Sequence, residues 1–191
     1  SFSRIDELKK RFDNYKLSLV SIYGAGENIA TEIFTRLNVN GKPLTTFEIL
    51  CAKHYRRDEF NLRLKRDAQK DKHARCFFSF DDKTVLMALS ACVTKNFDCK
   101  ESTILSLDSD TFIEAWDKVD RAFDRAIDFL RSTFLIPSSK YLPYQNLVIP
   151  FVWYFYSTDK TISIEGRRIL EDYFWRVSLS QSFLQGVAGQ L

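Results

Sequence analysis

Five residues between Ile33 and Leu50 have the types and spacing that suit an anion. Arg36, Asn38, Asn40, Gly41 and Lys42 fall within seven residues. An Arg side chain offers a planar fork of donors that matches phosphate. A helix–turn–helix corner explains Asn40 and Gly41, because both residue types adopt positive φ at low cost. It does not require Arg36 and Lys42, so a solvated corner and a polyanion or nucleotide site both stay open.

A second candidate is the basic stretch from Lys53 to Arg75. It holds nine Lys or Arg residues against four acidic ones, a local charge of +5. A solvated helix face is the simpler interpretation. The alternative is contact with a DNA phosphate backbone, which would be salt-sensitive and blind to sequence. The candidate DNA contacts are Arg56, Arg57, Arg63, Lys65 and Arg66.

The sequence gives little support for catalysis, metal binding or membrane insertion. The 191 residues carry 28 basic and 25 acidic side chains, a net charge of +3 that does not by itself indicate nucleic acid. No nucleophile–base motif, Walker loop or GxGxxG motif occurs, so we name no catalytic residue. The four cysteines and two histidines lack metal-ligand spacing, so no metal site is expected. The longest apolar run, Leu147–Tyr156, is about half of what a bilayer span needs.

The elements that would position these residues are mainly helical. Lys16–Tyr23 alternates as a strand does, and it would need a partner for its backbone groups. A helix begins near Asn28. Thr45 and Glu48 form a capping box that starts another helix, which we expect to continue to about Ala68.

Further helices are predicted at about 82–96, 109–134, 144–157 and 163–180. The 109–134 segment has apolar residues at alternating steps of four and three, which indicates a core-facing seam. Pro150 should kink its helix or mark the first turn. Ser163 should cap the last helix, in which Arg176 forms either a buried or a surface ion pair.

Several segments together resemble a known family. They are "EIFTRLNVNGKPLTTFEILCA", "YKLSLVSIYGAGENIATEIF", "LPYQNLVIPFVWYF" and "EDYFWRVSLSQSF". In this order they are similar to the domain of unknown function 262 family, the N-terminal domain of GmrSD-type restriction endonucleases, which is ParB/sulfiredoxin-like. The family's Asp-Gly-Gln-Gln-Arg motif is missing here. The chain is therefore expected to be the C-terminal helical part of a truncated domain.

The resemblance implies a mainly α fold, a multi-helix orthogonal bundle with one short N-terminal strand. Residues 1–44 would be the tail end of the ParB-like portion, and residues 45–191 the helical subdomain. It also implies that Arg36 and Asn38, with Asn40, Gly41 and Lys42 as neighbours, face a nucleotide. No cofactor is expected in this chain, whereas a nucleoside triphosphate and Mg²⁺ would belong to the full-length protein.

The expected function is that of a non-catalytic regulatory domain in a cytoplasmic bacterial restriction or phage-defence protein. It would bind nucleotide, sense DNA and control a nuclease in cis or in trans. Two alternatives stay open. One is a helical nucleic-acid-binding module that uses residues 53–75. The other is a scaffold that dimerises through the Lys16–Tyr23 strand, because an unpaired strand edge invites augmentation.

Overall fold

The computed structural model describes residues 2–16, 23–24, 29, 33, 44–56, 59–158 and 161–180. Within these ranges the protein is mainly helical and contains no strand, which confirms the predicted fold class. The only β pairing there is an isolated antiparallel bridge between Arg56 and Phe60. The strand predicted at Lys16–Tyr23 falls largely on residues 17–22, outside the described part. Dimerisation through that strand stays a prediction.

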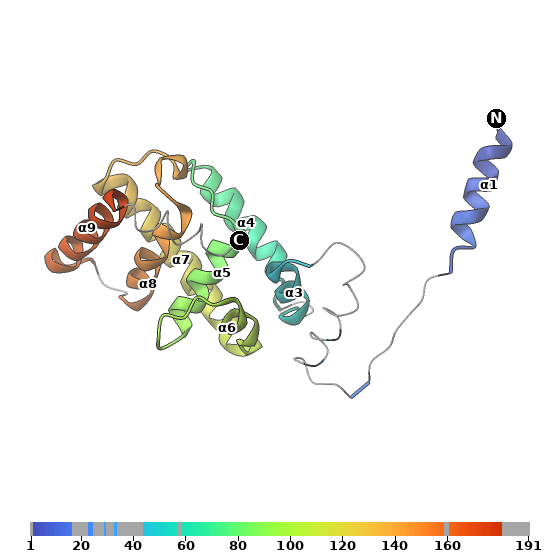
Figure 1. Ribbon diagram of the computed structural model, residues 1–191, viewed down its shortest axis with the longest axis horizontal. Coiled ribbons are helices and arrows are strands. Elements are labelled where there is room, and N and C mark those ends of the chain that lie inside the picture. The colour runs from blue at the N-terminus through green and yellow to red at the C-terminus, as the bar shows by residue number, and fades with distance from the viewer. Residues whose placement is uncertain are drawn as a thin grey trace.

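From α3 to α9 the helices follow one another with short connections (Figure 1). The elements are α1 (Phe2–Asp13), α3 (Thr46–Lys53), α4 (Leu62–Ala74), α5 (Asp82–Val93), α6 (Glu101–Ser106), α7 (Ser109–Thr133), η2 (Ser139–Tyr141), η3 (Gln145–Val148), α8 (Ile149–Ser157) and α9 (Ile164–Leu179).

The capping box at the start of α3 is confirmed. The Thr45 hydroxyl accepts a hydrogen bond from the Glu48 backbone N–H at 3.2 Å, and the Thr45 backbone N–H donates to the Glu48 carboxylate at 2.8 Å. The predicted continuation to Ala68 is wrong, because α3 ends at Lys53 with His54 as its C-cap. Asn61 then starts α4, and its side chain accepts from the Leu64 backbone N–H at 3.2 Å.

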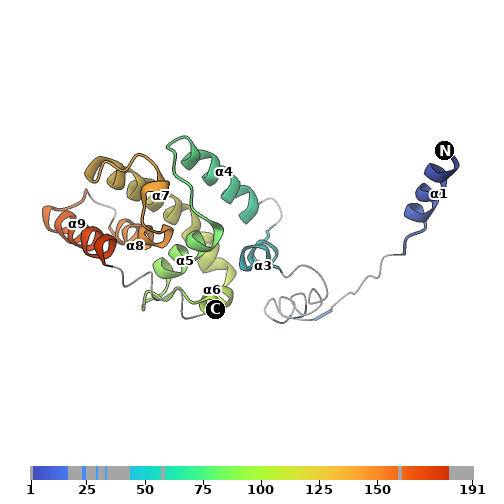
Figure 2. The ribbon, with the colours of Figure 1, turned by 45° about the horizontal axis from the view of Figure 1, so that its top comes forward.

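The core is organised around α7, which packs against α5 and α8 (Figures 1 and 2). The predicted seam is confirmed, since its helical members are all buried: Phe112, Trp116, Val119, Phe123, Ile127 and Leu130. Phe134, the last residue of the predicted seam, is half-buried at the C-cap of α7. Its ring stacks on Phe174 of α9 with 3.9 Å between centroids, so α9 joins the same core.

The last two helices begin at the predicted signals. A 3₁₀ turn, η3, replaces the first residues of the predicted 144–157 helix, and Pro150 lies in the first turn of α8 without ending it. Ser163 caps α9, accepting from the Gly166 backbone N–H at 3.0 Å. Arg176 forms an ion pair with Asp172 at 2.7 Å, and both side chains are exposed. Of the two alternatives for Arg176, the surface ion pair is therefore the one found. None of the helices in the described ranges combines the length and apolar character needed to cross a membrane.

Candidate functional site

The predicted nucleotide corner lies outside the described residues. This holds for all five of its members, Arg36, Asn38, Asn40, Gly41 and Lys42. Their roles therefore stay predictions. Arg57, one of the predicted DNA contacts, also lies outside the described part.

The other predicted DNA contacts lie on or beside α4, and two of them meet carboxylates of α7. Arg56 forms an ion pair with Asp110. Lys65 Nζ lies 2.8 Å from Asp117 Oδ1. Arg63 is exposed and places its guanidinium carbon 5.9 Å from the centroid of the Phe47 ring. The structure thus brings acidic side chains from a distant part of the sequence against this basic stretch.

Arg66 is an interior residue, which corrects its prediction as a DNA contact. Its side chain is only 1% exposed. Nε donates to Asp82 Oδ1 at 2.9 Å, Nη1 donates to Gln69 Oε1 at 3.0 Å, and Nη2 donates to the Phe80 carbonyl. A guanidinium enclosed in this way cannot reach a phosphate at the surface. Its role is to join α4 to α5 and the loop before it.

A set of polar contacts, which we call the charge ladder, runs between α4 and α7. It comprises Lys65, Gln69, Lys72 and His73 of α4 with Asp117, Asp120 and Asp124 of α7. Lys72 Nζ contributes twice, at 2.5 Å from Asp120 Oδ2 and 2.9 Å from Asp124 Oδ2. The local +5 of the sequence is therefore opposed by carboxylates, and the α7-facing side of α4 is not a free cationic surface.

His73 lies at one end of the charge ladder, where it contacts Asp124. Its ring is almost fully buried, and Nε2 lies 3.2 Å from Asp124 Oδ1. Burial lowers the pKa of His73, more than the Asp124 carboxylate raises it. The imidazole is therefore neutral at pH 7 and donates to Asp124 through Nε2–H.

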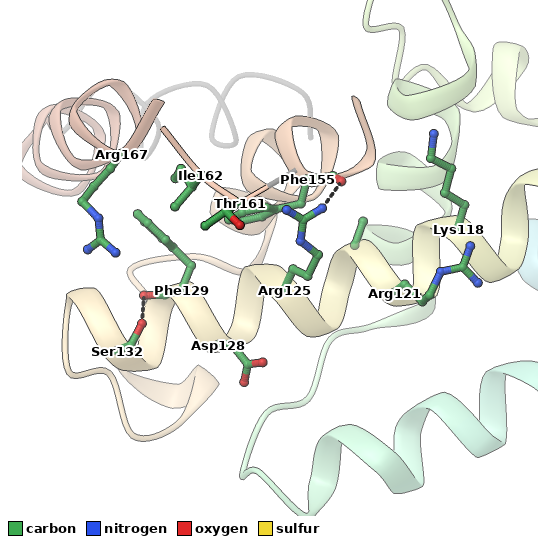
Figure 3. Close-up of a pocket in the computed structure, with 11 residues that line it drawn as sticks. Lys118, Arg121, Arg125, Asp128, Phe129, Ser132, Phe155, Thr161, Ile162 and Arg167 are labelled. Atoms are coloured by element: carbon green, nitrogen blue, oxygen red, sulfur yellow. Dashed lines mark hydrogen bonds between the residues drawn. The ribbon is translucent and has the colours of Figure 1, made fainter. Parts of the chain in front are cut away.

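A neighbouring face of α7 carries a groove of about 590 Å³ (Figure 3). It lies between α7, the C-terminal end of α8 and the beginning of α9. Its described lining contains four cationic side chains and one carboxylate. These charged residues are Lys118, Arg121, Arg125, Arg167 and Asp128. Figure 3 shows the first three projecting from α7, with Arg167 reaching in from α9.

Arg125 is fixed by the end of α8. Its Nη1 donates to the Phe155 carbonyl at 3.0 Å and to the Thr158 carbonyl. The last carbonyls of a helix lack partners within the helix and carry partial negative charge. The guanidinium carbon also lies 4.8 Å from the centroid of the Phe155 ring. Arg125 thus stabilises the end of α8 while it contributes positive charge to the groove.

Two other cations lie over aromatic rings. Arg167 places its guanidinium carbon 5.4 Å from the Phe129 ring centroid, and its Nη1 donates to Thr133 Oγ1 at 3.0 Å. Lys118 Nζ lies 4.5 Å from the Tyr156 ring centroid. Such contacts are attractive and restrict where each cation sits. The groove therefore presents positive charges whose positions are partly set before any ligand arrives.

Among the groove cations, Arg121 and Lys118 are the most available to bind a ligand. Neither forms an ion pair with another residue of the described ranges, and Arg121 is exposed. A guanidinium and an ammonium without a carboxylate partner bind anions, and the planar fork of Arg matches both carboxylate and phosphate. This arrangement can therefore bind a ligand that carries phosphate or carboxylate groups.

Sequence reasoning did not find this groove. In the 109–134 segment, Lys118, Arg121 and Arg125 alternate with acidic residues on the polar faces, a pattern that is typical of a solvated surface. A usable signal did exist, because steps of three and four residues place these cations on one face of the helix. The acidic residues of the charge ladder occupy the adjacent face of α7. The contribution of Arg167 depends on how α9 packs, which the sequence does not reveal.

Comparisons of the chain with protein-family models, curated proteins and solved structures give no match. The resemblance to the domain of unknown function 262 family therefore rests on the sequence segments quoted above. Across the described residues, His, Cys, Asp and Glu side chains do not gather in groups of three that could hold a metal ion.

Proposed function

We propose that this protein is a regulatory domain that binds nucleic-acid phosphates through the groove along α7. In the setting that the family resemblance suggests, it would belong to a cytoplasmic bacterial restriction or phage-defence protein. The domain senses DNA and controls a nuclease in cis or in trans, without catalysing the reaction itself. In the full-length protein, a nucleoside triphosphate and Mg²⁺ would bind elsewhere, near the corner that contains Arg36 and Asn38.

The observation that carries this proposal is the gathering of four cationic side chains around one groove. Three of them follow α7 from Lys118 to Arg125, a distance of about 10 Å at 1.5 Å per residue. A row of this length suits a ligand with several phosphates better than it suits one phosphate. Nucleic acid is an abundant cellular ligand that carries many phosphates in a row.

The charge ladder supports the choice of the groove over α4. On α4, Lys65 and Lys72 already have carboxylate partners, and Arg66 is buried. A phosphate that approached there would have to displace Asp117 or Asp120, and both carboxylates would repel it. The groove lining contains one carboxylate, Asp128, against its four cations, of which Arg167 also lies 3.8 Å from Glu171 of α9.

Equilibrium binding to a labelled DNA duplex tests the proposal. We expect the affinity to fall as salt rises, because each neutralised phosphate releases counterions, with a slope of about −0.9 per contact in a log–log plot. Arg121→Gln should weaken binding and lower the slope by about one contact. Arg75→Gln removes the same charge from an exposed site outside the groove lining and serves as the control. Affinity that does not depend on salt would contradict the proposal.

A further inference from the structure

We infer that the groove takes the sugar–phosphate backbone of duplex DNA and reads no bases. This inference rests on the proposed function and names the form of nucleic acid that the same site selects. Its basis is the relation between the groove cations and the aromatic rings beneath them.

Single-stranded nucleic acid is usually bound on exposed aromatic faces, where each stacked base contributes about 1–3 kcal/mol. The two phenylalanines in the groove, Phe129 and Phe155, are each only 5% exposed. Their rings are also covered by Arg167 and Arg125 respectively. A base that entered the groove would find cations in place of an aromatic platform.

The third cation–ring contact extends the same pattern. Lys118 lies over Tyr156, just before the end of α8. The rings therefore hold the cations in place, and the cations face the ligand. A surface of this kind recognises phosphate charge and its spacing, which are the same for every DNA sequence.

The higher charge density of duplex DNA favours its binding over that of a single strand. Duplex DNA carries about one negative charge per 1.7 Å of axis, and a single strand about half as many. The row from Lys118 to Arg125 therefore meets more phosphate charge on a duplex. A stiff duplex also loses less conformational freedom on binding than a flexible single strand does.

Asp128 is the carboxylate of the groove lining. Its exposed carboxylate lies three residues after Arg125 on α7, close to one helical turn away. A phosphate bound by Arg125 would be repelled by this charge. Asp128→Asn should therefore raise duplex affinity by about two- to fivefold, and a gain of this kind cannot come from misfolding.

The experiment compares two unrelated duplexes of about 20 base pairs with one single strand of the same length, all at low salt. We expect the two duplexes to bind equally within about twofold, and the single strand to bind at least about fivefold more weakly. Asp128→Asn should strengthen duplex binding, and Arg121→Gln should weaken it. Arg75→Gln, outside the groove lining, is the control for net charge.

The outcomes separate this inference from the function on which it rests. A single strand that binds as tightly as the duplex, or a strong preference for one duplex sequence, would overturn backbone reading but leave phosphate binding intact. Unchanged duplex affinity in Asp128→Asn would also count against the groove as the contact surface. If neither form of DNA binds the parent protein at low salt, the proposed function fails as well.

Discussion

Protonation of His54 should destabilise the fold at mildly acidic pH. The imidazole lies at the C-cap of α3 and is fully buried. It stacks on Phe112 of α7 with 4.2 Å between ring centroids, and Nδ1 lies 2.9 Å from Ser109 Oγ. Nε2 is buried and has no hydrogen-bond partner among the described residues. A second proton would therefore place a charge in the protein interior, where the nearby Asp108 carboxylate compensates only part of the lost solvation.

The size of the effect follows from the pKa. Burial, with a smaller contribution from the Lys53 cation, lowers the pKa of His54 from 6.5 to about 4. Because the folded pKa is the lower one, the unfolded chain binds more protons between these two values. Stability is therefore full above pH 6.5 and declines as the pH falls toward 4. At about pH 4.5 the loss from this residue is roughly 2–3 kcal/mol.

Urea unfolding of the parent protein and of His54→Phe, at about pH 7.5 and about pH 4.5, measures this loss. Phenylalanine keeps a ring on Phe112 and removes the titrating group. We expect the parent to lose roughly 2–3 kcal/mol more than the variant between the two pH values. Carboxylates titrate in both proteins, so their effect cancels in the difference. Equal losses in the two proteins would refute this reasoning.

Three other substitutions test the packing that positions the groove and α4. Gly166→Ala should destabilise α9 by about 1–3 kcal/mol in urea unfolding, because the added Cβ would lie 1.9 Å from Tyr154 Oη. Tyr154→Leu in the same chain should restore part of that loss. Arg66→Ala should cost about 2–4 kcal/mol, since it removes the buried hydrogen bonds to Asp82 and its neighbours. Thr45→Ala should cost about 1 kcal/mol through loss of the α3 cap.

Sequence patterns predicted the strongly signalled local features. Thr45 and Ser163 cap helices where expected, because an N-cap depends on a few neighbouring residues. The buried face of α7 could be predicted for a similar reason, because the spacing of apolar residues indicates which face of a long helix is buried. The short helix α6 was not predicted. It has six residues, and Lys100 at its N-cap makes no side-chain cap hydrogen bond.

Contacts between distant segments account for what the sequence could not predict. The break between α3 and α4 depends on His54 reaching Phe112 and Ser109, more than fifty residues away. The burial of Arg66 depends on Asp82 and on the Phe80 carbonyl. A count of local charge treats every Lys and Arg as solvated. Such a count draws attention to the Lys53–Arg75 stretch, with its local charge of +5, and gives no sign of the groove.

The most direct test compares two double variants, each of which removes two positive charges, in one case from the groove and in the other from α4. The double variant Lys118→Gln with Arg121→Gln removes two groove cations, and Arg63→Gln with Lys65→Gln removes two from α4. Both are titrated with a duplex of about 20 base pairs at low salt, after circular dichroism confirms that they are folded. We predict that the groove variant binds about tenfold or more weakly, whereas the α4 variant stays within about twofold of the parent. Loss of binding in the α4 variant with an unaffected groove variant would contradict the account.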